Sequence, residues 1–134
     1  AWHWQKKHGL SPKDRLIATM PKWAPWAARF PFVANLRDTL PGAARLSERV
    51  AGFTAQRVLP QWRRDTFLSS RAAREAAVET PDVVLLVDTF NNYHEPENAH
   101  AALRVLRAAG YRVAVARPKA TDHEPSRPLC CGRG

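Results

Sequence analysis

The sequence predicts an α/β protein in which a proline-broken helical arm, residues 1–67, precedes an incomplete parallel β-α-β unit, residues 68–134. Three patterns in the second region lead to this prediction. Residues 83–87 form an uninterrupted aliphatic run, typical of a strand that is buried on both faces. Apolar residues then recur at helical spacing from 99 to 106, and apolar and polar residues alternate from 111 to 116. Strand, helix and strand in this order close into a parallel sheet with a right-handed crossover.

Short helices separated by prolines are predicted for the first 80 residues. Residues 1–10 have the pattern of a helix end that stops at Gly9. Ser11 and Pro12 begin the next helix, because serine caps helix N-termini and proline fits the first helical position. The side chains expected to face inward from it are Leu16, Ile17 and Met20. Further prolines divide the aromatic stretch 23–32 into short helical pieces.

Two more helices are predicted before the β-α-β unit. The first begins at Pro41 and Gly42 and ends at Pro60. One stripe of this helix consists of Leu46, Val50, Phe53 and Arg57. The second helix spans residues 71–79, with Ser69 or Ser70 as its N-cap.

Turn-forming residues bound the elements of the β-α-β unit. The first strand, 83–87, is followed by a polar loop, 88–92. Proline and glycine at the two ends of the next segment fit the first position and the stop of a helix. We therefore predict that 83–87 and 111–116 are adjacent parallel strands, with a helix over 96–109 packed across them.

Basic charge and tryptophan are concentrated in the arm. The 134-residue chain carries a net charge of +9, and residues 1–67 hold 12 Lys and Arg against 4 Asp and Glu, together with all five tryptophans. This composition suits a connector that packs on a partner domain, a membrane interface, or a nucleic-acid surface. There is no contiguous basic run, which counts against nucleic acid. No apolar run approaches the roughly 20 residues that a membrane-spanning helix needs.

Three polar residues of the β-α-β unit are candidates for chemistry. Asp88 ends the first strand, where α/β sheets place functional groups, or it is a loop aspartate that accepts backbone hydrogen bonds. Phe90 stands where a phosphatase-like nucleophile would need a second Asp, so that function is excluded. Glu97 and His100 have a spacing seen in metal-binding bundles, but one copy on a solvent-facing stripe is a weak signal. No Gly-x-Gly-x-x-Gly follows the strand, so dinucleotide binding is not predicted there.

Cys130 and Cys131 are the two cysteines of the chain and are adjacent. A disulfide between neighbours needs a strained ring, so the alternatives are metal or cluster ligation, and chance. The pair follows a complete β-α-β pattern, and Gly132 would let the backbone approach a bound group closely. Thiolates in such a loop suit an iron–sulfur cluster, although a cluster or a tetrahedral metal needs about four ligands.

Several segments of the second region resemble the cysteine-rich CCG domain of FAD-linked oxidases, of the D-lactate dehydrogenase and glycolate oxidase iron–sulfur type, which is related to a domain of heterodisulfide reductase. They are residues 88–93 (DTFNNY), 95–99 (EPENA), 109–113 (AGYRV) and 127–133 (RPLCCGR). Upstream segments resemble that family's connector between a ferredoxin-like domain and the CCG domain. They are residues 8–10 (HGL), 14–16 (DRL), 24–27 (APWA), 35–38 (NLRD) and 59–63 (LPQWR). The resemblance covers nearly the whole chain, and its second half is the more specific part.

The resemblance implies iron–sulfur electron transfer. In the family, a flavin domain oxidises a 2-hydroxy acid, and the clusters pass the electrons toward a quinone or another carrier. Cys130 and Cys131 carry over as candidate ligands of a 4Fe–4S cluster. The flavin domain, the ferredoxin cysteines and the later Cys-x-x-Cys of a CCG repeat are missing, and residues 88–89 stand where the repeat's first cysteine is expected. We therefore expect a fragment at both ends, with an incomplete ligand set and no turnover by itself.

These observations predict a fragment of an electron-transfer domain of a FAD-linked 2-hydroxy-acid oxidoreductase. Residues 1–67 would be the connector that follows and docks on a missing ferredoxin-like domain, and residues 68–134 the N-terminal part of the CCG domain. The implied partners are the FAD-binding and ferredoxin-like domains or subunits. The expected location is cytoplasmic, with peripheral membrane or quinone contact at the inner face as a further option. The alternative is a non-catalytic basic adaptor that docks on a membrane surface or on nucleic acid.

Overall fold

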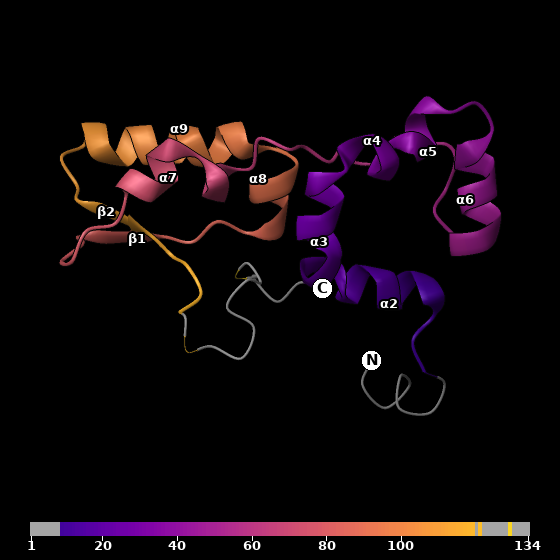
Figure 1. The fold of residues 1–134 in the computed structure, drawn as a ribbon, viewed down its shortest axis with the longest axis horizontal. Coiled ribbons are helices and arrows are strands. Elements are labelled where there is room, and N and C mark those ends of the chain that lie inside the picture. Colours follow the sequence, from indigo (N-terminus) through magenta and orange to yellow (C-terminus); the bar gives the residue numbers. More distant parts are fainter. Residues whose placement is uncertain (1–8, 120, 122–128, 130–134) are drawn as a thin grey trace.

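The computed structural model describes residues 9–119, 121 and 129. Figure 1 shows the helical arm at one end of this part of the chain and the α/β unit at the other. The arm contains α2 (Pro12–Ala18), α3 (Met20–Arg29), α4 (Pro31–Ala34), α5 (Leu36–Thr39) and α6 (Ala43–Ala51). The α/β unit contains the 3-10 helix η1 (Phe67–Ser69), α7 (Arg71–Glu75), β1 (Val83–Leu85), α8 (Thr89–Tyr93), α9 (Pro96–Ala108) and β2 (Val113–Val115). No helix among the described residues is long and apolar enough to cross a lipid bilayer.

The predicted parallel β-α-β unit is confirmed. β1 and β2 form a two-stranded parallel sheet in which Val84 lies opposite Ala114. α9 begins at Pro96, as predicted, and ends just before Gly110, whose φ of 86° favours a residue without a Cβ. Both strands are three residues long, so they are shorter than the predicted ranges.

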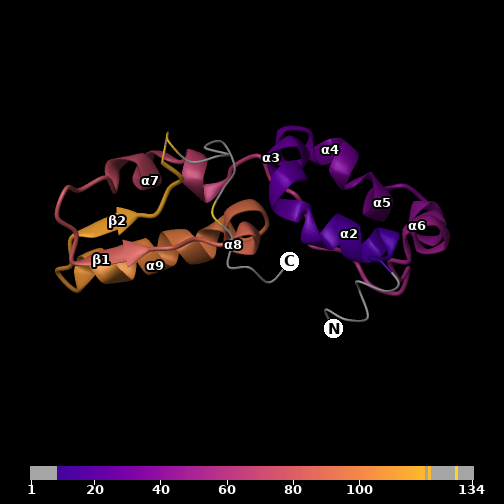
Figure 2. The same cartoon turned by 90° about the horizontal axis from the view of Figure 1, so that it is seen from below.

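The described helices cover one face of the sheet. Figure 1 and Figure 2 together show α7 and α9 on the same side of the two strands. On the other side, Val84 is 60% exposed and Leu86 is 53% exposed. The prediction that the run 83–87 is buried on both faces is therefore wrong for the described part of the chain. Because side chains alternate along a strand, a sheet with helices on one side leaves every second side chain in solvent.

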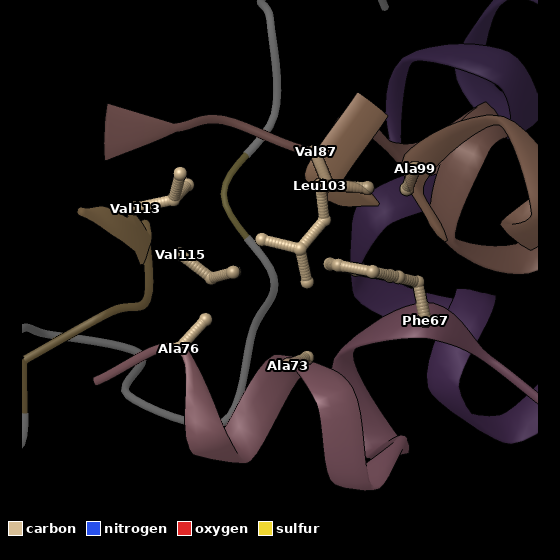
Figure 3. Packing of buried hydrophobic residues seen from close by; sticks show 8 residues of the cluster. All are labelled: Phe67, Ala73, Ala76, Val87, Ala99, Leu103, Val113 and Val115. Atoms are coloured by element: carbon tan, nitrogen blue, oxygen red, sulfur yellow. The ribbon is translucent and has the colours of Figure 1, made fainter. Parts of the chain in front are cut away.

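The side chains between the sheet and its helices form the core of the α/β unit. Phe67 and Leu103 are its two large fully buried side chains, at 0% and 2% exposed. Figure 3 shows Leu103 reaching from α9 toward Phe67. The other buried members are Ala73, Ala76, Val87, Ala99, Val113 and Val115. The boundary that was predicted between the arm and the α/β region falls between Phe67 and Leu68. Both of these residues pack in this core.

α7 begins where the sequence predicts but ends earlier. Ser70 caps the helix, because its Oγ accepts a hydrogen bond from the Ala73 N–H at 3.2 Å. The last helical residue is Glu75, because the carbonyl of the next residue, Ala76, accepts a hydrogen bond from the Val115 N–H of β2 at 3.0 Å. The chain that leaves α7 is therefore tied to the side of β2 that faces away from β1.

The first helix of the arm agrees with the prediction. Ser11 caps α2, since its Oγ accepts a hydrogen bond from the Asp14 N–H at 3.1 Å. Leu16 was expected to face inward, but it is 41% exposed, and the other two predicted inward residues of this region are half-buried. The helix end predicted over 1–10 lies mostly outside the described residues.

α6 differs from the prediction in its end and in its orientation. The helix stops at Gly52, whose φ of 73° ends it well before Pro60. Leu46 is 63% exposed and Val50 is 74% exposed. Leu46 and Val50 of the predicted stripe therefore face solvent, whereas Phe53 is half-buried.

Side-chain hydrogen bonds fold the arm back on the connector that leads to the α/β unit. The side chain of Asn35 accepts from the Trp62 N–H at 2.8 Å and donates to the Trp62 carbonyl at 2.9 Å. Arg37 donates to the Thr54 carbonyl at 2.6 Å and to the Ser47 Oγ at 3.2 Å. These bonds place the indole of Trp62 at the junction of the two parts of the molecule.

Candidate functional site

The predicted cluster ligands, Cys130 and Cys131, lie outside the described residues. Within the part of the chain that the structure describes, no group of three or more His, Cys, Asp or Glu side chains is arranged to hold a metal ion. The described residues therefore offer no metal site of their own, and the 4Fe–4S assignment stays a prediction.

Asp88 has a structural role at the carboxyl end of β1. Its Oδ1 accepts hydrogen bonds from the N–H and from the side-chain amide of Asn91, both at 2.8 Å. Asp88 is thereby the N-cap of α8, which replaces the polar loop predicted over 88–92. The interpretation of Asp88 as a residue that accepts backbone hydrogen bonds is confirmed, and the predicted loop is wrong because an Asp cap is sufficient to begin a short helix.

Glu97 and His100 have separate partners. A carboxylate oxygen of Glu97 lies 2.7 Å from the Arg63 guanidinium. The His100 ring lies edge-on to Phe67, with ring centroids 4.9 Å apart. The spacing that suggested a metal site thus serves a surface ion pair and an aromatic contact. This ion pair is exposed and contributes little stability.

His94 is a buried polar residue that the sequence analysis did not single out. It ends α8, is 8% exposed, and places Nδ1 2.9 Å from the Gln61 carbonyl oxygen. Its ring lies 4.3 Å from the Trp62 ring and 5.7 Å from the Phe90 ring, measured between centroids. A carbonyl only accepts, so Nδ1 carries the proton, and Nε2 is left as an acceptor in the neutral ring. Burial lowers the pKa of His94, which keeps the imidazole neutral at pH 7.

An apolar cavity of about 390 Å³ lies between the arm and α8, next to His94. Aliphatic and aromatic side chains make up most of its wall. They include Trp23, Trp26, Phe53, Trp62 and Phe90. A space of this size and lining is compatible with a small apolar molecule. The sequence carried no local signal for it, because its wall combines residues from distant parts of the chain.

Burial of His94 makes stability depend on pH. In the unfolded chain His94 has its ordinary pKa of 6.5, and in the folded chain its pKa is lower. Between these two pKa values, the unfolded chain binds more protons than the folded chain. We expect the free energy of unfolding to be constant above about pH 7 and to fall as the pH drops below about 6.5, by at most about 1.4 kcal/mol per pH unit. Denaturant titrations at several pH values measure this dependence.

Substitutions assign the pH dependence to this residue. His94→Gln is expected to flatten the profile between pH 5 and 7, whereas His100→Gln, at a half-buried histidine, is the matched control. An unchanged profile in the His94 variant would contradict the assignment.

Comparison of the chain with known proteins finds no match. The chain matches no protein-family model, no curated protein and no solved structure. The class that the described residues define is a mixed helical and α/β protein with a small parallel sheet. The resemblance to FAD-linked oxidases therefore depends on the quoted segments of the sequence alone.

Proposed function

We propose that this chain is part of an iron–sulfur electron-transfer unit of a FAD-linked oxidoreductase that acts on 2-hydroxy acids. The observation that carries the proposal is the sequence Cys130-Cys131-Gly132 downstream of a parallel β-α-β unit. Two adjacent thiolates followed by a glycine in the sequence suit a cluster, which supplies one-electron transfer when it is bound. The segments that resemble the CCG domain support the same function.

The order of elements supports the proposal without defining the chemistry. Strand, helix and strand follow one another as the CCG-like segments require, and the carboxyl ends of β1 and β2 lie at the same edge of the sheet. β2 ends at this edge, and the two cysteines follow β2 in the sequence. Carboxyl edges of parallel sheets are where α/β proteins place their functional groups.

The ligand set of this chain is incomplete for the proposed cluster. Two thiolates are present, and a 4Fe–4S cluster needs about four. No described residue cluster supplies the rest. Under the proposal, the other ligands come from cysteines outside this sequence, and the FAD belongs to another domain or subunit.

The first test is reconstitution of the 134-residue chain with iron and sulfide under anaerobic conditions. We expect the chain to stay colourless, because two neighbouring thiolates leave a cluster open and labile. The same treatment of a polypeptide or complex that also carries the missing cysteines is expected to give a brown protein with about four irons per cluster. Iron quantitation and the broad visible absorbance measure both results.

Substitution of the cysteines completes the test. In the cluster-containing protein, Cys130→Ser and Cys131→Ser are expected to lower iron content and slow electron transfer to the acceptor, while flavin reduction by substrate is retained. Val78→Ser, which introduces a hydroxyl at a position far from the pair in the sequence, is the control. If both cysteines only pack as small hydrophobes, the double serine variant keeps its iron and acceptor rate, and the proposal fails.

A further inference from the structure

A second cavity, of about 690 Å³, lies between the C-terminal half of α3 and η1. We call it the basic cleft. Its polar lining comes from three places in the chain: the end of α3, the connector into η1, and α8. These polar residues are Arg29, Arg64, Thr66, Ser69 and Tyr93.

The two arginines of the basic cleft have no carboxylate partner among the described residues. The ion pairs of the described structure use Arg37, Arg63, Arg71 and Arg112. The carboxylate adjacent in sequence, Asp65, is held by Arg63 through two hydrogen bonds of 3.0 and 2.6 Å. Neither of the two positive charges of the cleft forms an ion pair within the described structure.

Arg64 is oriented toward the cleft by a backbone contact. Its Nη2 donates to the carbonyl of Arg29 at 3.1 Å. This bond joins the connector to the end of α3, and both arginines, 35 residues apart in the sequence, line the cleft. Both arginines are exposed, and two positive charges that line one cleft favour an anion bound between them.

Tyr93 and two hydroxyls complete the polar lining. Tyr93 is 5% exposed, and burial raises the pKa of its phenol to about 12, so the hydroxyl stays protonated and keeps a proton to donate at neutral pH. The Thr66 hydroxyl donates to the Ser69 Oγ at 3.0 Å, and the Ser69 hydroxyl donates to the Thr66 carbonyl at 2.9 Å. These two bonds fix the turn that brings η1 to the cleft.

We propose that the basic cleft binds a phosphate group through Arg29, Arg64 and Tyr93. Planar guanidinium groups match the oxygens of phosphate and bind them with charge-assisted hydrogen bonds. A phosphate presents oxygens in several directions, which suits donors that arrive from α3, the connector and α8, whereas the oxygens of a carboxylate lie in one plane. The volume of the cleft is large enough for a phosphate and the organic group that carries it.

Two sources of the phosphate are compatible with the rim of the cleft. Phe30 lines the cleft. The centroid of its ring lies 5.6 Å from that of the Trp26 ring and 6.4 Å from that of the Phe32 ring. Trp26 is 57% exposed and Phe32 is 68% exposed. Exposed aromatic rings beside cations suit the headgroup region of a membrane, so a phospholipid is one source. A phosphorylated small molecule is the other.

The first experiment measures the binding of inorganic phosphate to the full 134-residue chain. We expect the melting temperature to rise with phosphate concentration, and not with sodium chloride of equal ionic strength, because only a ligand of the folded state stabilises it specifically. Arg29→Gln and Arg64→Gln are each expected to weaken phosphate binding about tenfold. The matched controls are Arg45→Gln and Arg49→Gln on α6, each of which removes one positive charge at an exposed position.

The second experiment adds lipid vesicles of phosphatidylglycerol or of phosphatidylcholine and measures cosedimentation. Binding to the anionic vesicles that is lost in the Arg29 and Arg64 variants and in Trp26→Ala assigns the phosphate to a lipid headgroup. Saturable phosphate binding without vesicle binding assigns it to a small molecule. The proposal is overturned if chloride raises the melting temperature as much as phosphate does. It is also overturned if an α6 control variant loses as much affinity for phosphate as the cleft variants, or if neither phosphate nor anionic vesicles bind.

Discussion

Phe67→Ala is expected to lower the free energy of unfolding by about 3–5 kcal/mol. Phe67 is 0% exposed and packs with Leu103 and the side chains of both strands in the core of the α/β unit. Its removal costs the transfer free energy of the ring and leaves a cavity between η1 and α9. Since a domain of this size is stable by only about 5–15 kcal/mol, a large fraction of the variant is expected to be unfolded at moderate denaturant concentration.

Equilibrium denaturation in urea, followed by circular dichroism, measures this effect. Phe32→Ala is the matched control, because the same side chain is removed at a position that is 68% exposed, and a change of about 0.5 kcal/mol or less is expected there. Equal costs for the two substitutions would contradict the assignment of Phe67 to the core.

Trp62→Ala is expected to separate the arm from the α/β unit. The Trp62 ring lies 5.0 Å from Trp23 of α3, 6.0 Å from Tyr93 and 4.3 Å from His94, so it contacts both parts of the molecule. Trp62 is half-buried, so loss of this side chain is expected to cost less than the ~3–5 kcal/mol of a fully buried aromatic residue and to replace a single unfolding transition by two. The arm would unfold first, because its own described helices are short and much of their apolar surface is exposed.

Two probes follow the two parts separately. All remaining tryptophans lie in residues 1–67, so their fluorescence reports on the arm. Hydrogen exchange of the Val83 and Ala116 amides reports on the sheet, because these N–H groups donate to the Arg112 and Leu85 carbonyls across the two strands. Trp26→Ala, at a residue that is 57% exposed, is the control and is expected to keep one transition. Coincident transitions with an unchanged midpoint in Trp62→Ala would show that Trp62 does not couple the parts.

The elements that the sequence predicted correctly are those with local signals. Pro96 and Gly110 define the ends of α9 through backbone geometry that acts within one turn of the helix. Ser11 and Ser70 cap their helices as expected, for the same reason. The parallel pairing of the strands followed from the order of these elements, because a helix between two strands favours a crossover connection.

The errors have non-local causes. An aliphatic run such as 83–87 does not reveal how many helices will cover the sheet, so burial on both faces was an overestimate. α7 is ended by a hydrogen bond between Ala76 and Val115, which are far apart in the sequence. The environment of His94 also depends on a distant segment, residues 61–62. Spacing within one segment carried no information about these contacts.

The hydrogen bond between the Ala76 carbonyl and the Val115 N–H also makes the two borders of the small sheet unequal. It occupies part of the outer side of β2, whereas β1 has β2 as its one strand neighbour among the described residues. An edge strand with unpaired N–H and C=O groups is a template for intermolecular β-pairing. The exposed Val84 and Leu86 side chains add apolar surface that favours such association. The solubility of the chain at high concentration will therefore depend on β1, where one lysine in place of Val84 would act as a gatekeeper against fibrillar association.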